Sequence, residues 1–150
     1  MKTEEYLIPY QTTHLTGHRV IVFAPHPDDE TIGCGGSIAL HAAAGDAVKV
    51  IILTNGAQAN LSDNIPKEEY ISIRQKEAKR ACEILGISDI EFWQYEDRRL
   101  ADSEGVLNRM ADAIRSFDAE LIYISSPMEF HPDHRAAVFW LEKVIRNSDL

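Results

Sequence analysis

The chain has 150 residues, 45% of them hydrophobic, which is enough for one domain with a substantial buried core. Its formal net charge of −9 argues against nucleic acid or an anionic membrane surface as the main partner. No apolar run approaches the ~20 residues of a membrane-spanning helix, and the polar segment 1–16 lacks the apolar core of a signal peptide. We therefore expect a cytoplasmic protein.

The two cysteines, Cys34 and Cys82, are far apart in the sequence and lie in apolar or helical surroundings. A chain of this length needs no disulfide, and we expect both thiols to be buried and reduced, as in a reducing compartment. Cys34 follows an acidic loop, but it falls inside the next predicted helix. We therefore do not favour it as a metal ligand.

Residues 1–17 are polar and mixed in charge, and they predict an irregular N-terminal arm. The continuous apolar run at 20–24 is typical of a strand covered on both faces, and Pro25 and Pro27 end it. Apolar periodicity and glycine stops predict the later elements, which are helices at 33–44, 68–85, 104–117 and from 131 onward, and strands at 48–53, 90–95 and 121–124.

Strands and helices alternate along the chain, without repeats, low-complexity tracts or linkers. This alternation predicts a single α/β domain over 1–150, a Rossmann-like three-layer α/β/α arrangement with a mostly parallel sheet. We assume the strand order 3-2-1-4, in which the first and fourth strands are neighbours. The helix at 68–85 is expected to pack through an apolar stripe made of Tyr70, Ile73, Ala78, Ala81, Ile84 and Leu85.

The loop after the first strand reads Pro25-His26-Pro27-Asp28-Asp29-Glu30. Three carboxylates in one short loop repel one another, and burying a carboxylate costs several kcal/mol unless it is compensated. A divalent cation is the simplest compensation. Capping of the next helix explains one or two of the acids, but it does not explain a histidine between two prolines. The loop therefore indicates a metal site.

A second loop, His131-Pro132-Asp133-His134, follows the fourth strand. In the assumed strand order the two loops meet at the carboxyl ends of adjacent strands, where such folds bind ligands. The alternative is that these histidines are surface residues in the first turn of a helix. The similar make-up of the two loops argues against it and predicts one shared site.

These residue types suit a catalytic zinc site, which has three protein ligands and one open position. His26, Asp29 and His134 can supply two imidazoles and one carboxylate. Asp28 is then free to act as a base toward a metal-bound water, whose pKa falls to ~7. His131 remains to meet charge that develops on the substrate. The same ligand set accepts iron as well as zinc.

From about residue 19 to about residue 140 the sequence resembles the LmbE/PIG-L family of zinc-dependent de-N-acetylases. The resemblance rests on the two histidine–aspartate motifs and on Gly35-Gly36, Thr54, Gly56, Arg74, Glu77 and Leu85-Gly86. It implies a Rossmann-like fold and removal of the acetyl group from an N-acetylglucosamine-type amino sugar. The implied cofactor is Zn²⁺, with Fe²⁺ as the alternative, and the implied partner is a small-molecule amino sugar conjugate.

By motif position, His26, Asp29 and His134 match the family's metal ligands, and Asp28 matches the general base that activates the metal-bound water. His131 matches the histidine that stabilises the oxyanion.

Other positions match supporting roles in the family. Arg74 and Asp97 correspond to places where family members contact the sugar. We interpret Glu30 and Asp133 as residues that orient the groups around the metal.

The family's chains are generally longer, whereas this sequence stops directly after the helix that follows His134. We therefore expect the C-terminal part of the family fold to be missing and the 150 residues to belong to a longer chain. The strand at 121–124 would otherwise be an apolar edge, which invites pairing with another chain. Further domains or a homo-oligomer are expected to cover it.

Two other function classes stay open. One is a metal-dependent amidase that acts on a thiol conjugate, and the other is a non-catalytic metal- or sugar-binding domain. The presence of Asp28 argues against the second class, because a binding domain needs no base beside its metal.

Overall fold

Four parallel strands form the central sheet in the order β3-β2-β1-β4, which confirms the assumed order. They are β1 (Arg19–Ala24), β2 (Ala47–Thr54), β3 (Asp89–Tyr95) and β4 (Leu121–Tyr123). The computed structural model describes residues 15, 17–60 and 64–147. The predicted N-terminal arm at 1–17 therefore lies almost wholly outside the described residues.

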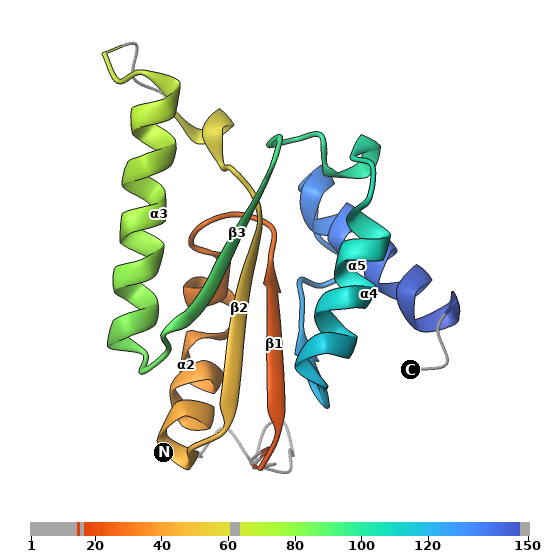
Figure 1. Ribbon diagram of the computed structural model, residues 1–150. Helices are drawn as coiled ribbons and strands as arrows, with labels where there is room; N and C mark the ends of the chain where they lie inside the picture. The colour runs from red at the N-terminus through yellow and green to blue at the C-terminus, as the bar shows by residue number, and fades with distance from the viewer. Residues whose placement is uncertain (1–14, 16, 61–63, 148–150) are drawn as a thin grey trace, which may run out of the picture.

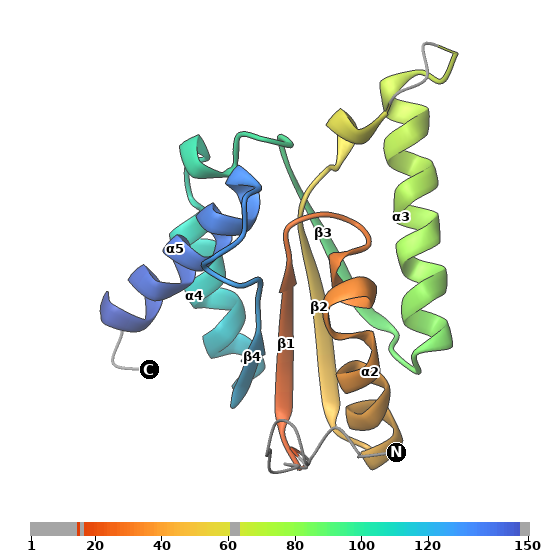
Figure 2. The ribbon, with the colours of Figure 1, turned by 180° about the vertical axis from the view of Figure 1, so that it is seen from behind.

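Helices cover both faces of the sheet, as Figures 1 and 2 show from opposite sides. On one face lie α2 (Asp29–Ala44) and α3 (Lys67–Ile84), and on the other lie α4 (Val106–Phe117) and α5 (Pro132–Asn147). Two short 3-10 helices, η1 (Ala57–Ala59) and η2 (Leu100–Asp102), follow β2 and β3. The predicted three-layer arrangement is thus confirmed.

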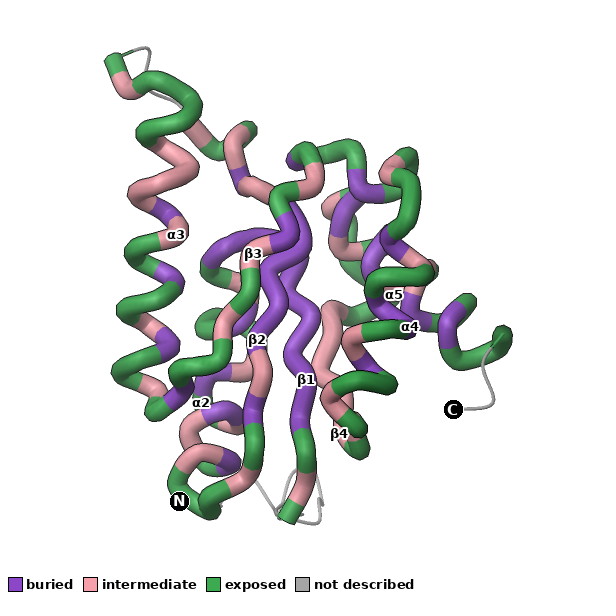
Figure 3. Tube along the Cα trace, in the orientation of Figure 1, coloured by how far each residue is buried: buried purple, intermediate pink, exposed green. Residues whose placement is uncertain are grey.

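Successive side chains of β1 point to opposite faces of the sheet, and they contribute to two separate halves of the core. Val20, Val22 and Ala24 pack with residues of α2 and α3. Ile21 and Phe23 pack with residues of α4 and α5. All five side chains are at most 2% exposed, and the buried stretch of β1 and β2 forms the centre of Figure 3. A continuous apolar run is therefore what a strand in the middle of this sheet requires.

Helix α2 begins at Asp29, so the predicted start at residue 33 is wrong. The acidic loop itself opens the helix, because two acids in its first turn interact favourably with the helix dipole. The backbone at Cys34 is not helical, with φ −144° and ψ 19°, and it bends the helix one turn after the acids. The run of glycines around Cys34 explains why the sequence pattern starts the helix late.

The apolar stripe predicted for α3 is partly wrong. Ile84 is 73% exposed, whereas Arg74, Ala78 and Cys82 form the buried face. Arg74 can lie on this face because its guanidinium donates hydrogen bonds to loops at the edge of the sheet, which a count of apolar residues does not anticipate.

Both cysteines are free, as expected. Cys82 is buried, and burial raises the pKa of its thiol to about 12. Cys34 is only half-buried, and burial raises the pKa of its thiol to about 11. Both thiols therefore stay protonated at neutral pH, the unreactive form.

Among the described residues, no helix combines the length and the apolar character that crossing a membrane requires.

Ile51 tests the packing of this core, because it is fully buried beside Phe23 in the half that faces α4 and α5. We expect Ile51→Ala to lower the free energy of unfolding by about 3–4 kcal/mol through lost burial and the cavity left behind. Chemical denaturation followed by circular dichroism measures the change. The exposed Ile84→Ala is the matched control and should stay within about 0.5 kcal/mol of the parent. Equal effects would place Ile51 outside the core.

Candidate metal centre and active site

The two histidine–aspartate loops meet at one edge of the sheet. β1 and β4 are parallel neighbours with Val22 opposite Tyr123, so their carboxyl ends point the same way. The loop after β1 carries His26, and the chain after β4 leads to His131 and into α5. The predicted meeting of these loops is confirmed, because side chains from both are in contact.

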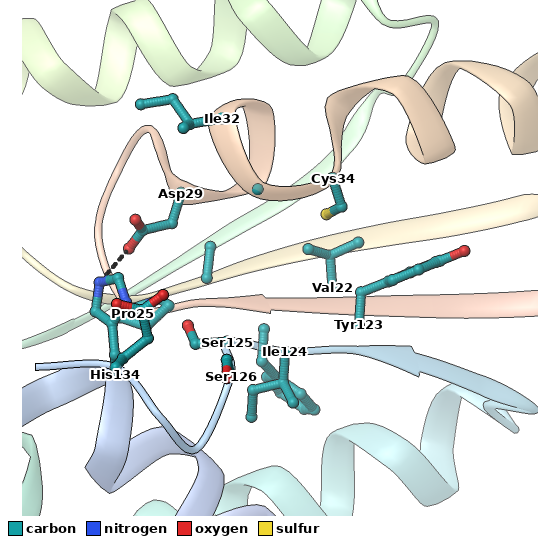
Figure 4. A pocket seen from close by; sticks show the side chains of 14 residues that line it. Val22, Pro25, Asp29, Ile32, Cys34, Tyr123, Ile124, Ser125, Ser126 and His134 are labelled. Carbon is teal, nitrogen blue, oxygen red and sulfur yellow. Dashed lines mark ion pairs between the residues drawn. The ribbon is translucent and has the colours of Figure 1, made fainter. Parts of the chain in front are cut away.

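The Asp29 carboxylate lies between two imidazoles. Its Oδ2 is 3.2 Å from His26 Nδ1 and 3.0 Å from His134 Nε2, and it accepts a hydrogen bond from the His26 backbone amide at 2.9 Å. Figure 4 shows Asp29 directed at the His134 ring. Burial alone would raise the pKa of Asp29, but its hydrogen bonds to His134 and His26 hold it well below the usual range.

The other nitrogen of His26 faces two more carboxylates. His26 Nε2 is 3.1 Å from Asp133 Oδ2 and 3.3 Å from Asp97 Oδ1. Burial would lower the pKa of His26, yet the hydrogen bonds to Asp133 and Asp29 raise it to about 9. An imidazole that bonds a carboxylate through one nitrogen is oriented to present the other to a metal.

Asp133 is fully buried and accepts two backbone hydrogen bonds, from the Arg98 amide at 2.6 Å and the Leu100 amide at 3.1 Å. Burial would raise the pKa of Asp133, but the hydrogen bond with His26 and these amides lower it. Asp133 therefore connects the start of α5 with the loop after β3 and with His26. The sequence indicates an orienting partner here but not its histidine, which belongs to the other loop.

The His131 ring lies beside the rings of His26 and His134. Its ring centroid is 4.6 Å from that of His26 and 5.4 Å from that of His134. The Asp133 backbone amide donates a hydrogen bond to His131 Nδ1 at 3.3 Å. Burial and the neighbouring His26 lower the pKa of His131.

The donor atoms at this edge fit a divalent cation. Ring nitrogens of His26, His131 and His134 lie close enough to one another to share an ion, and His26, Asp97, His131 and Asp133 form an overlapping group. Asp97 belongs to the second group, and its Oδ1 is a buried atom without a hydrogen-bond partner in the described part of the chain. Imidazole and carboxylate donors are those that zinc and iron accept. Cys34 belongs to neither group, and its thiol donates to the Glu30 carbonyl. Asp29 also lies outside both groups, and it adjoins them through its contacts with His26 and His134.

The remaining acids of the first loop have other partners. Asp28 Oδ2 is 2.8 Å from Arg74 Nη2. Burial raises the pKa of Asp28, and Arg74 opposes the shift. Glu30 is buried, and it accepts hydrogen bonds from the Asp28 amide at 3.0 Å and from the Thr31 hydroxyl at 2.9 Å. Burial also raises the pKa of Glu30. Glu30 therefore holds the loop in shape through these hydrogen bonds, and its role toward a metal stays a prediction.

Asp97 Oδ2 accepts a hydrogen bond from the Gln58 amide at 2.9 Å, which ties the loop after β3 to η1. The structure brings both predicted sugar contacts, Arg74 and Asp97, to the same cavity as Asp28 and His131. Their role toward a sugar stays a prediction.

Two cavities adjoin at Asp29. The more polar one, of about 330 Å³, is lined by His26, Asp28, Asp29, Gln58, Ala59, Arg74, Asp97, Arg98 and His131. The other, of about 480 Å³, lies between the first turns of α2 and the chain after β4, and Figure 4 shows Val22, Ile32, Tyr123 and Ile124 among its lining residues. The predicted base and the predicted oxyanion histidine thus face the polar cavity.

Comparisons with known proteins identify the family of the chain and relatives of its fold. Residues 21–145 match the family described as PIG-L, GlcNAc-PI de-N-acetylase. The chain is similar to the diacetylchitobiose deacetylase of Thermococcus kodakarensis, with 32% identity over 124 residues that cover 81% of this chain and 46% of the relative. Its fold is similar to that of N,N'-diacetylchitobiose deacetylase from Pyrococcus horikoshii, with a TM-score of 0.82 and 29% identity, covering 87% of this chain and 50% of the other.

A further relative has a different named activity. The 4-oxalmesaconate hydratase of Pseudomonas putida is 32% identical over 124 residues, which cover 79% of this chain and 48% of the relative. The chain spans about half the length of these curated relatives. Because the family match covers most of the chain and includes both histidine–aspartate loops, the chain belongs to the PIG-L (LmbE) family.

Proposed function

We propose that this chain is the catalytic part of a metal-dependent hydrolase that removes the acetyl group from an N-acetylglucosamine-type amino sugar conjugate. The observation that carries the proposal is the placement of Asp28 and His131 on one polar cavity beside the His26–Asp29–His134 cluster. The family description and the names of the two deacetylase relatives support this choice of substrate.

His26, Asp29 and His134 are the proposed metal ligands, and zinc, with iron as the alternative, is the proposed ion. A cation bound by these groups supplies Lewis-acid polarisation of water and of the amide carbonyl. The residues of the chain position the proposed ligands before the ion binds. Asp133 orients the His26 ring through Nε2, so that Nδ1 faces Asp29, and Asp29 in turn contacts His134.

Asp28 is the proposed general base. It lines the polar cavity next to the ligand Asp29, where it can accept the proton of a water that attacks the acetyl carbonyl. Burial raises the pKa of Asp28 and so makes it a stronger proton acceptor than an ordinary carboxylate. The same carboxyl, once protonated, can return the proton to the departing amine.

His131 is the proposed oxyanion donor. Because the Asp133 amide donates to its Nδ1, the neutral His131 ring carries its proton on Nε2. A neutral ring can therefore donate a hydrogen bond to the developing oxyanion, and the lowered pKa of His131 favours this neutral form.

The direct test of the proposed function is an assay of metal-loaded, full-length protein on N-acetylglucosamine derivatives, with free amine and acetate both measured. Equal release of the two products supports de-N-acetylation. A metal-loaded protein that hydrolyses none of them would favour a metal- or sugar-binding domain.

The hydratase relative makes hydration of an unsaturated acid the second candidate function. Offering an unsaturated dicarboxylic acid in the same assay separates the candidates, because hydration consumes the double bond and releases neither amine nor acetate. An amidase that acts on thiol conjugates would release amine from such a conjugate without preferring an N-acetyl sugar.

Asp133 tests the support of the metal site. We expect Asp133→Asn to weaken metal affinity by about 10–100-fold, because the His26 ring loses its charged hydrogen-bond partner. Competition with a chelator measures the affinity, and thermal unfolding checks that the variant is folded. The exposed Asp112→Asn is the control and should bind metal as the parent does. An unchanged affinity in a folded Asp133→Asn protein would remove Asp133 from this role.

Asp28→Asn tests the base. The variant should keep its metal, since Asp28 is not a proposed ligand, and should lose hydrolysis by roughly 10²–10⁴-fold. Metal content by elemental analysis and the rate of acetate release measure the two quantities. Near-normal hydrolysis would show that another group takes the proton.

His131→Ala tests the oxyanion donor. Turnover should fall by about 10²–10³-fold while the metal stays bound, because one donor to the oxyanion is lost. The contrary result is a stoichiometric loss of metal. It would make His131 a ligand, a role its distance from the rings of His26 and His134 also permits.

A further inference from the structure

Arg74 is buried, and each of its three described hydrogen bonds goes to the protein itself. Nη1 donates to the Gly56 carbonyl at 3.0 Å, and Nη2 donates to the Pro27 carbonyl at 2.7 Å. Nη2 also donates to Asp28 Oδ2 at 2.8 Å. A planar guanidinium that bonds three acceptors at fixed angles holds them in one geometry, which a lysine cannot reproduce.

Gly56 lies directly against this guanidinium. Its backbone is left-handed, with φ 62° and ψ 21°. A Cβ built on Gly56 would overlap Arg74 Nη1 and come within 2.9 Å of Pro27 Cδ. A side chain at position 56 therefore requires both the guanidinium and the Pro27 ring to move. Arg74 lines the polar cavity and Gly56 does not, so Gly56 contacts the guanidinium outside the cavity.

Asp28 has a backbone that needs external support. Its φ of 155° and ψ of −26° lie outside the regions that side-chain-bearing residues ordinarily occupy. Strain of this kind persists only when surrounding contacts hold it, and it is common at active sites. The contacts here are the Glu30 carboxylate on the Asp28 amide and Arg74 on both the Pro27 carbonyl and the Asp28 side chain.

We propose that Arg74 is a positioning residue that fixes the Asp28 carboxylate for the reaction, and that Gly56 makes room for it. The proposal rests on the proposed function for its catalytic consequence but not for its geometry. It differs from a sugar-contact role in what it predicts. A lost sugar contact raises KM, whereas a displaced base lowers kcat.

The geometric part is tested by thermal unfolding of the full-length protein, which needs no substrate. Gly56→Ala should lower Tm by roughly 4–8 °C more than Gly105→Ala does, because it adds overlap to backbone strain. Gly105 is the matched control. It has the same left-handed backbone, with φ 78°, and nothing within 4 Å of a built Cβ.

The Arg74→Lys background then decides whether the overlap is with the guanidinium. A lysine has no atom equivalent to Nη1, so the excess effect of Gly56→Ala should shrink toward that of Gly105→Ala. Additive effects of Gly56→Ala and Arg74→Lys would overturn the claim that Gly56 acts through Arg74.

The catalytic part is tested by kinetics of the metal-loaded variants. Both Arg74→Lys and Gly56→Ala should lower kcat by about 10–100-fold, with KM within about threefold of the parent. Gly105→Ala should leave both constants unchanged. A tenfold or larger rise in KM with kcat retained in Arg74→Lys would overturn the positioning role in favour of a sugar contact. If the parent itself hydrolyses no amide, the proposed function fails while the unfolding measurements still decide the geometry.

Discussion

The site depends on one pairing, that of β1 with β4. Three residue pairs define their register, from Val20 opposite Leu121 to Val22 opposite Tyr123. A slip of one residue would move the chain after β4 by about 3.3 Å along the sheet. His134 Nε2 and Asp29 Oδ2 are 3.0 Å apart, and a shift of that size would separate the two atoms beyond hydrogen-bonding distance. Among the described strands, β4 has β1 as its sole neighbour, so this register is held from one side.

A second constraint is the compensation of charge around His26. The ring lies between Asp29 on one side and Asp133 on the other, and Asp133 in turn accepts the amides of Arg98 and Leu100. Three segments that are far apart in the sequence therefore meet at one imidazole. The acids that repel one another in the unfolded chain become partners of cations and amides in the fold, which is why they can be buried.

Much of this arrangement follows from local pattern. Apolar runs and glycine stops predict the strands, the helices and, with the assumed order, the meeting of the two loops. The pattern does not predict that Arg74 is buried, because helical periodicity assigns a charged residue to the solvent face. Nor does it show that Asp133 serves the histidine of the other loop or that His41 is buried between Asp46 and Tyr123. Apart from the contact of His41 with Asp46, these pairings join residues distant in sequence, and only the packed fold brings them together.

The close approach of Gly56 to Arg74 also restricts how this sequence can change over evolutionary time. A side chain cannot appear at position 56 while the guanidinium occupies the space that its Cβ would need. The residue at position 74 must first become shorter, and that change leaves the Pro27 carbonyl and the Asp28 carboxylate without their common donor. Loss of the arginine removes the nearer of the two overlaps at position 56, but the Pro27 ring and the left-handed backbone of Gly56 remain. Position 56 therefore stays restricted in either background, and most tightly while the arginine is present.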